Sequence, residues 1–208
     1  WDRSVDPNKL EQKVKDARPS VVLVIGSETP VGTCHLIPGL RDAIGPDTLF
    51  AVDEVSLMGG HHWDRSGIDF GFAGTQKCFR LPPGVQIGYV SERAMERAKH
   101  AVGATISNLY HLALRAEEGT YMATENTPLI RALEQVVFDL LKAGGGEYMN
   151  NRNATLNEIY DAFLDQLAEL DVSSFPERKY ASPTVGVYSY DPDRIKLALV
   201  AKAMRADR

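Results

Sequence analysis

The sequence predicts an α/β protein in which a largely parallel, mixed sheet is flanked by helices. Four short apolar runs are separated by stretches that carry helix or loop signals, which is the pattern of an alternating α/β chain. The first run is continuously apolar, as is typical of a strand covered on both faces. The 208 residues are 44% hydrophobic and 25% charged, so a core of useful size can be buried.

The first half of the chain supplies the sheet. A helix is expected to begin at Asp6-Pro7 and to end at Arg18-Pro19, because these pairs are start and stop signals. Ser91 is expected to cap a further helix over residues 92–99, with glutamates in its first turn as the helix dipole prefers. A short helix is expected over residues 35–44. The strands are predicted over residues 20–25, 49–52, 68–73 and 85–90.

The second half is predicted to be mostly helical. Residues 101–125 are less regular, and Thr127-Pro128 then opens an amphipathic helix that runs to Ala143. Three glycines stop it, and a second long helix is expected over residues 147–170. A strand over residues 183–190 and a helix over 194–204 begin a new layer.

The element order suggests two domains. Residues 1–145 are predicted to be part of a large domain, and residues 146–208 a connecting helix and the start of a smaller α/β C-terminal domain. One strand and one helix are too little for an independent unit, so we expect the chain to be a piece of a longer protein.

Composition argues against several classes of protein. A net charge of -5 does not favour a nucleic-acid-binding surface, and no apolar run approaches the roughly 20 residues that span a bilayer. Cys34 and Cys78 form no CxxC pair and no disulfide framework, which favours a reducing cytoplasm. The adjacent His61 and His62 have no acid or cysteine at ligand spacing, so we predict no metal site.

Polar residues follow the predicted strands. Thr29 comes after the first strand, Asp53 after the second, and Lys77 after the third. Ligands of open α/β sheets bind outside the carboxyl ends of the strands, so an acid and an amine would face one crevice. A desolvated lysine can condense with an aldehyde and move a proton, and a carboxylate can keep a pyridine nitrogen protonated. The commoner uses of these residues, as a turn-forming aspartate and a solvated lysine, remain open from position alone.

Local sequence adds a family resemblance. Residues 50–60, FAVDEVSLMGG, resemble the VD-x-V-S-S-x-G-G stretch of class V aminotransferases. The blocks GID at 67–69, GTQK at 74–77 and LPPG at 81–84 are similar to the signature GID…G(S/T)QK…LPPG of that family. The resemblance implies a fold-type I enzyme that uses pyridoxal 5'-phosphate, with Lys77 as the catalytic Schiff-base lysine and Asp53 as the partner of the ring nitrogen.

Two further segments extend the resemblance. Residues 28–32, ETPVG, are similar to the ET-x-x-G loop of the family, which assigns a cofactor contact to Thr29, although Pro30-Val31 stands where Ser-Thr is usual. Residues 126–128, NTP, and the later LK-x-x-GG…RN pattern resemble phosphoserine aminotransferases, in which the Asn and Thr reach the cofactor phosphate of the other subunit. A homodimer with shared sites is therefore implied. The implied cofactor-binding residues are Thr29, Asp53, Val55, Gln76, Lys77, Asn126 and Thr127.

The implied activity is transfer of an amino group between an amino acid and a 2-oxo acid. The NTP block favours phosphoserine with 2-oxoglutarate, as in serine biosynthesis, and the LPPG block leaves alanine–glyoxylate or serine–pyruvate chemistry as the alternative. A cysteine desulfurase is less favoured, because no reactive-cysteine loop is visible, and a non-catalytic class V fold acting as a binding module stays open. The phosphate loop, the ring-stacking aromatic and the carboxylate-binding arginine of the family have no counterpart here, so we expect this piece alone to be inactive.

Overall fold

A computed structural model describes residues 2–101, 108–120, 124–193 and 195. The helices are α1 (Pro7–Ala17), α2 (Leu40–Ile44), α3 (Glu92–Ala98), α4 (Leu109–Glu117), α5 (Thr127–Lys142) and α6 (Gly145–Leu167), with 3-10 turns at Ala168–Leu170 and Arg178–Tyr180. The strands are β1 (Val21–Ile25), β2 (Ser27–Glu28), β3 (Thr33–Cys34), β4 (Leu49–Asp53), β5 (Phe70–Gly74), β6 (Gln86–Val90), β7 (Ser173–Ser174) and β8 (Tyr188–Ser189).

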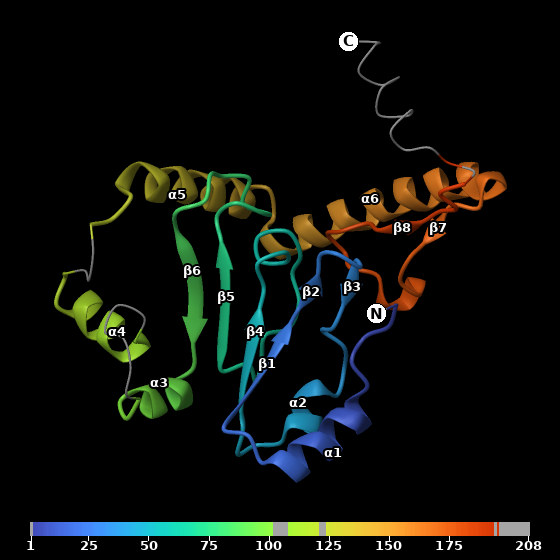
Figure 1. Cartoon of the computed structure of the whole chain (residues 1–208). Helices are drawn as coiled ribbons and strands as arrows, with labels where there is room; N and C mark the ends of the chain where they lie inside the picture. Colours follow the sequence, from blue (N-terminus) through green and yellow to red (C-terminus); the bar gives the residue numbers. More distant parts are fainter. Residues whose placement is uncertain (1, 102–107, 121–123, 194, 196–208) are drawn as a thin grey trace.

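The main sheet has four strands in the order β1-β4-β5-β6. The first three are parallel and β6 is antiparallel to β5, so the predicted α/β class with a largely parallel, mixed sheet is confirmed. Ile25, Asp53 and Phe72 pair across the three parallel strands. Figure 1 shows α5 and α6 lying across the edge at which these strands end. All four predicted strands are present, within two residues of their expected bounds.

The prediction that β1 is covered on both faces is wrong for the described structure. Val22 and Val24 pack against the core cluster, whereas Val21, Leu23 and Ile25 are 50%, 59% and 43% exposed. The buried side chains face α2, which contributes Leu40 and Ile44 to the same cluster. A continuously apolar run cannot distinguish a strand with two covered faces from an edge strand with one, because both bury apolar side chains.

Helix caps predicted from the sequence are present. The Asp6 side chain accepts hydrogen bonds from the backbone of Asn8 and Lys9, and Ser91 accepts one from Ala94. The short helix expected over residues 35–44 is reduced to Leu40–Ile44, since Thr33 and Cys34 pair with β2 in a hairpin and Pro38 follows. The region expected to be irregular contains α4, which Asn108 caps through the backbone of Tyr110.

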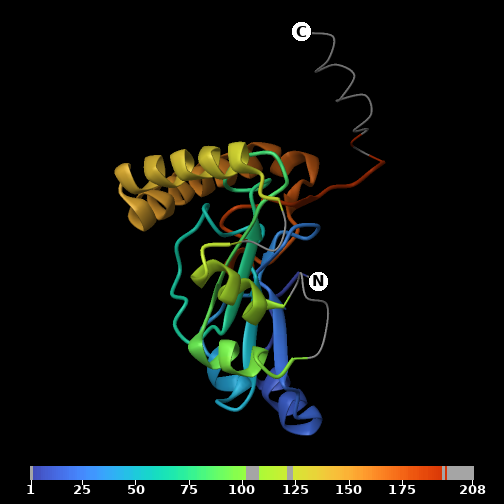
Figure 2. The same ribbon diagram turned by 90° about the vertical axis from the view of Figure 1, so that its left-hand side faces the viewer.

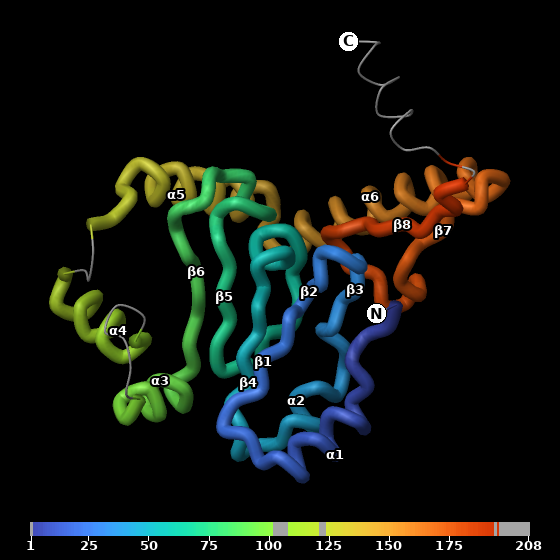
Figure 3. Tube along the Cα trace, in the orientation of Figure 1, coloured from blue at the N-terminus to red at the C-terminus, as the bar shows by residue number. Residues whose placement is uncertain are grey.

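The last segment differs most from expectation. The expected strand over residues 183–190 shrinks to two residues, β8, which pair with β7. Just before that stretch, residues 181 and 182 connect to the β2–β3 hairpin. Ala181 forms a bridge with Thr33, and the Ser182 amide donates a hydrogen bond to the Gly32 carbonyl. Figure 3 shows this chain path beneath α6. The helix expected over residues 194–204 lies outside the described residues.

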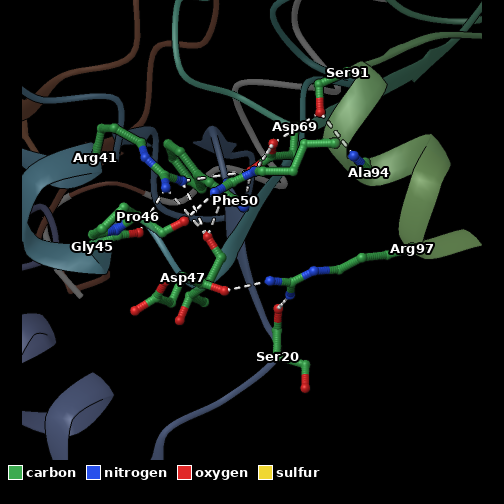
Figure 4. A network of polar contacts seen from close by, with 12 residues as sticks. Ser20, Arg41, Gly45, Pro46, Asp47, Phe50, Asp69, Ser91, Ala94 and Arg97 are labelled. Carbon is green, nitrogen blue, oxygen red and sulfur yellow. Dashed lines mark hydrogen bonds and ion pairs between the residues drawn. The ribbon is translucent and has the colours of Figure 1, made fainter.

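Asp69 organises the amino end of the parallel strands. It is 4% exposed and accepts hydrogen bonds from the Phe50 amide, the Ser91 hydroxyl and the Arg93 guanidinium. Arg41 lies 3.5 Å from the same carboxylate, and Figure 4 shows Asp69 within this network, between Arg41 and Ser91. Burial raises the pKa of Asp69, but the hydrogen bonds from Arg93, Phe50 and Ser91 together hold it below its ordinary value.

The arginines at this end also satisfy backbone carbonyls. Arg93 donates to Pro46 and Thr48, and Arg97 donates to Ser20 and Asp47. The chain segments entering β1 and β4 are therefore tied to α3, which Figure 2 shows beside the lower end of the sheet. Of the helices that the structure describes, none is long and apolar enough to cross a membrane.

Candidate functional site

A pocket of about 510 Å³ opens at the carboxyl end of the parallel strands. Its walls come from the loops after β4 and β5, from α6, and from the return segment between β7 and β8. Lys77 and Gln76 line one side, and Arg152 and Tyr160 of α6 line another. The position agrees with the rule that ligands of open α/β sheets bind beyond the strand ends.

The loop after β5 holds Lys77 at the pocket. Thr75 is fully buried, and its hydroxyl donates to the Pro82 carbonyl at 2.6 Å. Phe79 is also buried, so both flanks of the loop are anchored. The Gln76 side chain folds back over Gly74. Any residue with a Cβ at position 74 would collide with it. Lys77 itself is exposed. The described residues therefore do not bury the lysine, as a desolvated amine would require.

Asp53 ends the neighbouring strand β4. Its Oδ1 accepts a hydrogen bond from the Val55 amide at 2.9 Å, which turns the chain out of the strand. Within residues 2–101, 108–120, 124–193 and 195, no hydrogen bond or ion pair engages Oδ2. In the register, Asp53 pairs with Phe72, five positions before Lys77, but Asp53 and Val55 are not among the residues that line the pocket.

Ser56 joins three parts of the site, and the sequence analysis did not single it out. Its hydroxyl lies 2.9 Å from that of Thr29, which links the loops after β1 and β4. Its carbonyl accepts hydrogen bonds from Cys78 and Thr184. Ser56 also lines the pocket, so Thr29 is one hydrogen bond away from the cavity. The available signal was its place within the resembling stretch at residues 50–60.

Asn126 and Thr127 lie elsewhere. Asn126 caps α5, with its Oδ1 accepting from the Leu129 amide at 3.2 Å, and both residues are exposed. Neither lines the pocket of Lys77 in the same chain. The structure therefore gathers Ser56, Gln76 and Lys77 at one cavity. Thr29 lies in an adjoining loop and Asp53 at the end of β4, while Asn126 and Thr127 lie outside.

The pocket is rich in positive charge. Lys77, Arg80, Arg152 and Arg178 line it, and the described part of the chain contributes no aspartate or glutamate to its wall. Burial raises the pKa of the Cys78 thiol, and the three cations Arg152, Lys77 and Arg80 partly offset this. Burial likewise raises the pKa of Cys34, so neither thiol is activated for attack. Among the described residues, no group of three or more potential ligands could hold a metal ion.

A buried carboxylate supports the loop that carries Asp53. Glu54 is fully buried and accepts hydrogen bonds from Trp63, Arg65 and Tyr89. Burial raises the pKa of Tyr89, and its hydrogen bond to Glu54 raises it further. Successive residues thus have opposite surroundings: Glu54 is fully paired inside the protein, while Asp53 keeps one oxygen open.

Comparison with known proteins finds several aminotransferases among the relatives of the chain. The chain is 29% identical over 212 residues to phosphoserine aminotransferase of Rhodococcus opacus, covering 98% of the chain and 55% of that protein. It is 26% identical to alanine–glyoxylate aminotransferase 1 of Saccharomyces cerevisiae over 91% of the chain and 53% of that protein. The chain spans about half the length of the curated relatives it matches. No protein-family model matches it.

Solved structures show the same fold. Alanine–glyoxylate aminotransferase from Nostoc sp. superimposes with a TM-score of 0.81 at 23% identity, over 97% of the chain and 54% of that structure. Phosphoserine aminotransferase from Cytophaga hutchinsonii gives a TM-score of 0.68 at 23% identity, over 82% of the chain and 49% of that structure. The chain therefore has the mixed-sheet fold of these aminotransferases, and the relatives in sequence described above are aminotransferases too.

Proposed function

We propose that the chain is part of a pyridoxal-phosphate-dependent transaminase in which Lys77 is the lysine that bonds the cofactor. One observation carries the proposal: Lys77 lines a pocket beyond the end of β5, and the neighbouring strand β4 ends in Asp53 with one carboxylate oxygen open. The resemblance of the surrounding residues to class V aminotransferases supports the same assignment of roles.

The residues at this end of the sheet suit the cofactor chemically. An exposed amine at Lys77 is free to condense, and the open Oδ2 of Asp53 can accept a hydrogen bond from a protonated ring nitrogen. The hydroxyl of Thr29, held by Ser56, is a further polar contact. When bound, the cofactor would offer an aldehyde that condenses with an amine and releases water, and a ring that withdraws electrons from the substrate Cα.

The chain's own residues would then divide the work. Lys77 would hold the cofactor and, once displaced by the substrate amine, carry the proton from the substrate Cα. Asp53 would keep the ring nitrogen protonated, and Val55, whose amide fixes the Asp53 carboxylate, would position it. Gln76 would supply a neutral donor to the cofactor phosphate.

We also propose a homodimer for the whole protein, with Asn126 and Thr127 serving the cofactor phosphate of the other subunit. In support, both residues are exposed at the start of α5 and lie outside the pocket of their own chain. A helix N-terminus is a favourable place for a phosphate, since its free amides and dipole attract anions. A cytoplasmic location remains a prediction from the two free cysteines.

Phosphoserine with 2-oxoglutarate is the substrate pair that we propose. The NTP segment supports it, and so does the phosphoserine aminotransferase of Rhodococcus opacus, which aligns over 98% of the chain. An alanine–glyoxylate activity is the second candidate, supported by the yeast relative and by the Nostoc structure. A panel of amino donors and 2-oxo acids, tested on the whole protein, would separate the two.

Absorbance spectroscopy tests the cofactor role directly. The chain mixed with pyridoxal 5'-phosphate should give an imine band near the visible edge, and Lys77→Ala should remove it. Lys142→Ala, at an exposed lysine on α5, is the matched control and should keep the band. Borohydride reduction followed by peptide mapping should place the cofactor mass on Lys77. A band that survives in Lys77→Ala, or no band in the wild type, would favour the non-catalytic binding module instead.

A further inference from the structure

We infer that Arg152 binds an anionic group of the substrate, a carboxylate or a phosphate, and that the pocket prefers substrates with a second anionic group besides the amino-acid carboxylate. The inference rests on the proposed function, which makes the Lys77 pocket the substrate site. Four observations carry it: the position of Arg152 on the pocket side of α6, its buried Nε without a hydrogen-bond partner, a pocket wall to which the described residues contribute no acid, and the nearby cations Lys77 and Arg80.

The position of Arg152 is fixed by its neighbour. Asn153 is 3% exposed and donates to the Gly60 carbonyl at 2.7 Å, and the His62 amide donates to Asn150 at 3.0 Å. These bonds fasten the first turns of α6 to the loop after β4. Residues 152, 156 and 160 follow at helical spacing and line the same pocket, so one stripe of α6 faces Lys77.

The guanidinium of Arg152 has no acid partner among the described residues, unlike those of Arg178 and Arg65. Arg178 pairs with Asp161, and Arg65 pairs with Glu54. No carboxylate pairs with Arg152 in the described part of the chain, and its buried Nε has no hydrogen-bond partner there. Glu147 on the same helix makes no ion pair with it. A buried donor without a partner is unfavourable because it has lost its hydrogen bonds to water, and an oxygen of a bound anion would supply the missing acceptor.

The surroundings of Arg152 favour an anion over any neutral group. Arg152, Lys77 and Arg80 all act electrostatically on the Cys78 thiol, so the three cations share one neighbourhood. Among the residues that the structure describes, no aspartate or glutamate lines the cavity to neutralise them. Cations that gather in a recess attract anions more strongly than the same cations on an open surface, because less water screens them.

The anion could belong to the cofactor or to the substrate. In the proposed function, neutral donors from Gln76, Asn126 and Thr127 serve the cofactor phosphate, which leaves Arg152 for the substrate. An arginine also suits this role by geometry, since its planar fork matches the two oxygens of a carboxylate or phosphate. A substrate with two anionic groups would use the excess positive charge more fully than alanine or glyoxylate.

Calorimetric titration of the cofactor-free chain with succinate, acetate and inorganic phosphate tests the inference. Succinate should bind more tightly than acetate, and Arg152→Gln should weaken succinate binding at least tenfold. Arg152→Lys should weaken it less, because the charge remains but the fork is lost. Arg131→Gln, at an exposed arginine of α5 paired with Glu134, is the control and should leave binding unchanged.

The outcomes are distinguishable. Unchanged succinate affinity in Arg152→Gln, an equal loss in Arg131→Gln, or no succinate binding by the wild type would overturn the inference. A parallel titration with pyridoxal 5'-phosphate and with pyridoxal separates the two anion sources. Weaker binding of the phosphorylated form alone in Arg152→Gln would assign Arg152 to the cofactor and overturn a substrate role. Arg152-dependent succinate binding without any Lys77-dependent band would support the anion site and contradict the transaminase proposal.

Discussion

The two ends of the parallel sheet use arginine in opposite ways. At the amino end, Arg93 and Arg41 surround the buried carboxylate of Asp69, and the arginines also satisfy backbone carbonyls. At the carboxyl end, Arg80 and Arg152 line the same pocket as Lys77, and no described aspartate or glutamate lines it with them. Charge that is matched within the fold stabilises it, whereas charge left unmatched at a cavity is available to a ligand. Burial and pairing together, rather than residue type, separate the two uses.

The carboxyl end also contains a matched acid, which sharpens the contrast within a single loop. Glu54 is fully buried among Trp63, Arg65 and Tyr89, and the preceding Asp53 keeps an open oxygen. The end of β4 and the first residue after it therefore combine a candidate functional carboxylate with a structural one. Substitutions at the matched acids should affect stability, and substitutions at the unmatched cations should affect binding.

The largest effect is expected from Glu54→Ala. The variant would leave the Arg65 guanidinium, the Trp63 indole and the Tyr89 hydroxyl without their shared acceptor. Breaking a buried ion pair in this way costs about 3–5 kcal/mol of unfolding free energy. Urea unfolding followed by circular dichroism measures the loss. Glu147→Ala, at an exposed acid of α6, is the control and should stay within about 0.5 kcal/mol.

A smaller loss is expected from Asp69→Asn, at the other end of the sheet. The amide keeps one acceptor for the Phe50 amide or Ser91 but loses the charge facing Arg93, so the expected cost is about 1–3 kcal/mol. Equal or greater stability of Asp69→Asn at neutral pH would contradict a structural role for this carboxylate.

The contribution of Asp69 to the unfolding free energy should also depend on pH in a defined direction. Since the pKa of Asp69 is held below its ordinary value in the folded protein, its contribution is present above that ordinary value, about pH 4, and is lost as the pH falls toward the folded pKa. The difference in unfolding free energy between wild type and Asp69→Asn should therefore be constant from pH 7 to about pH 5 and shrink below about pH 4. A difference that grows on acidification would contradict the assignment.

The smallest effect on stability is expected at the unmatched cations. Arg80→Gln and Lys77→Gln remove charges that have no acid partner at the pocket, so unfolding free energies should change by no more than about 0.5 kcal/mol. Thermal unfolding in low salt would detect any difference. A loss above about 1 kcal/mol in either variant would show that these side chains hold the fold together, and the contrast between the two ends would fail.

Local signals predicted much of the secondary structure. Asp6 and Ser91 cap their helices, and Thr127-Pro128 begins α5, because capping depends on a side chain and on amides two or three residues away. The predictions failed where long-range pairing competed with local preference. The helix predicted over residues 35–44 begins only at Leu40, after residues 33–34 pair with 27–28. The strand predicted over residues 183–190 is reduced to Tyr188–Ser189, while the preceding residues 181 and 182 bond to the hairpin.

The site was predicted unevenly for a related reason. Lys77 and Gln76 could be placed at a strand end because the apolar runs located the strands, and their positions at the pocket follow from that. Ser56 and Arg152 were not recognised as part of the site, since the hydrogen bonds of Ser56 join residues as distant as Thr29 and Thr184. Arg152 reaches the same cavity from a helix 75 positions after Lys77.

Residue order and periodicity alone established the α/β class, the helix caps and the placement of an acid and an amine after neighbouring strands. Three-dimensional packing decided which charges are paired. Asp53 and Glu54 are adjacent acids that composition cannot distinguish. At the end of β4, however, the Glu54 side chain points into the interior, where it is fully hydrogen-bonded, while one carboxylate oxygen of Asp53 stays open. The reason is that pairing needs a partner brought from elsewhere in the chain, and only the folded arrangement of strands and helices fixes which partner that is.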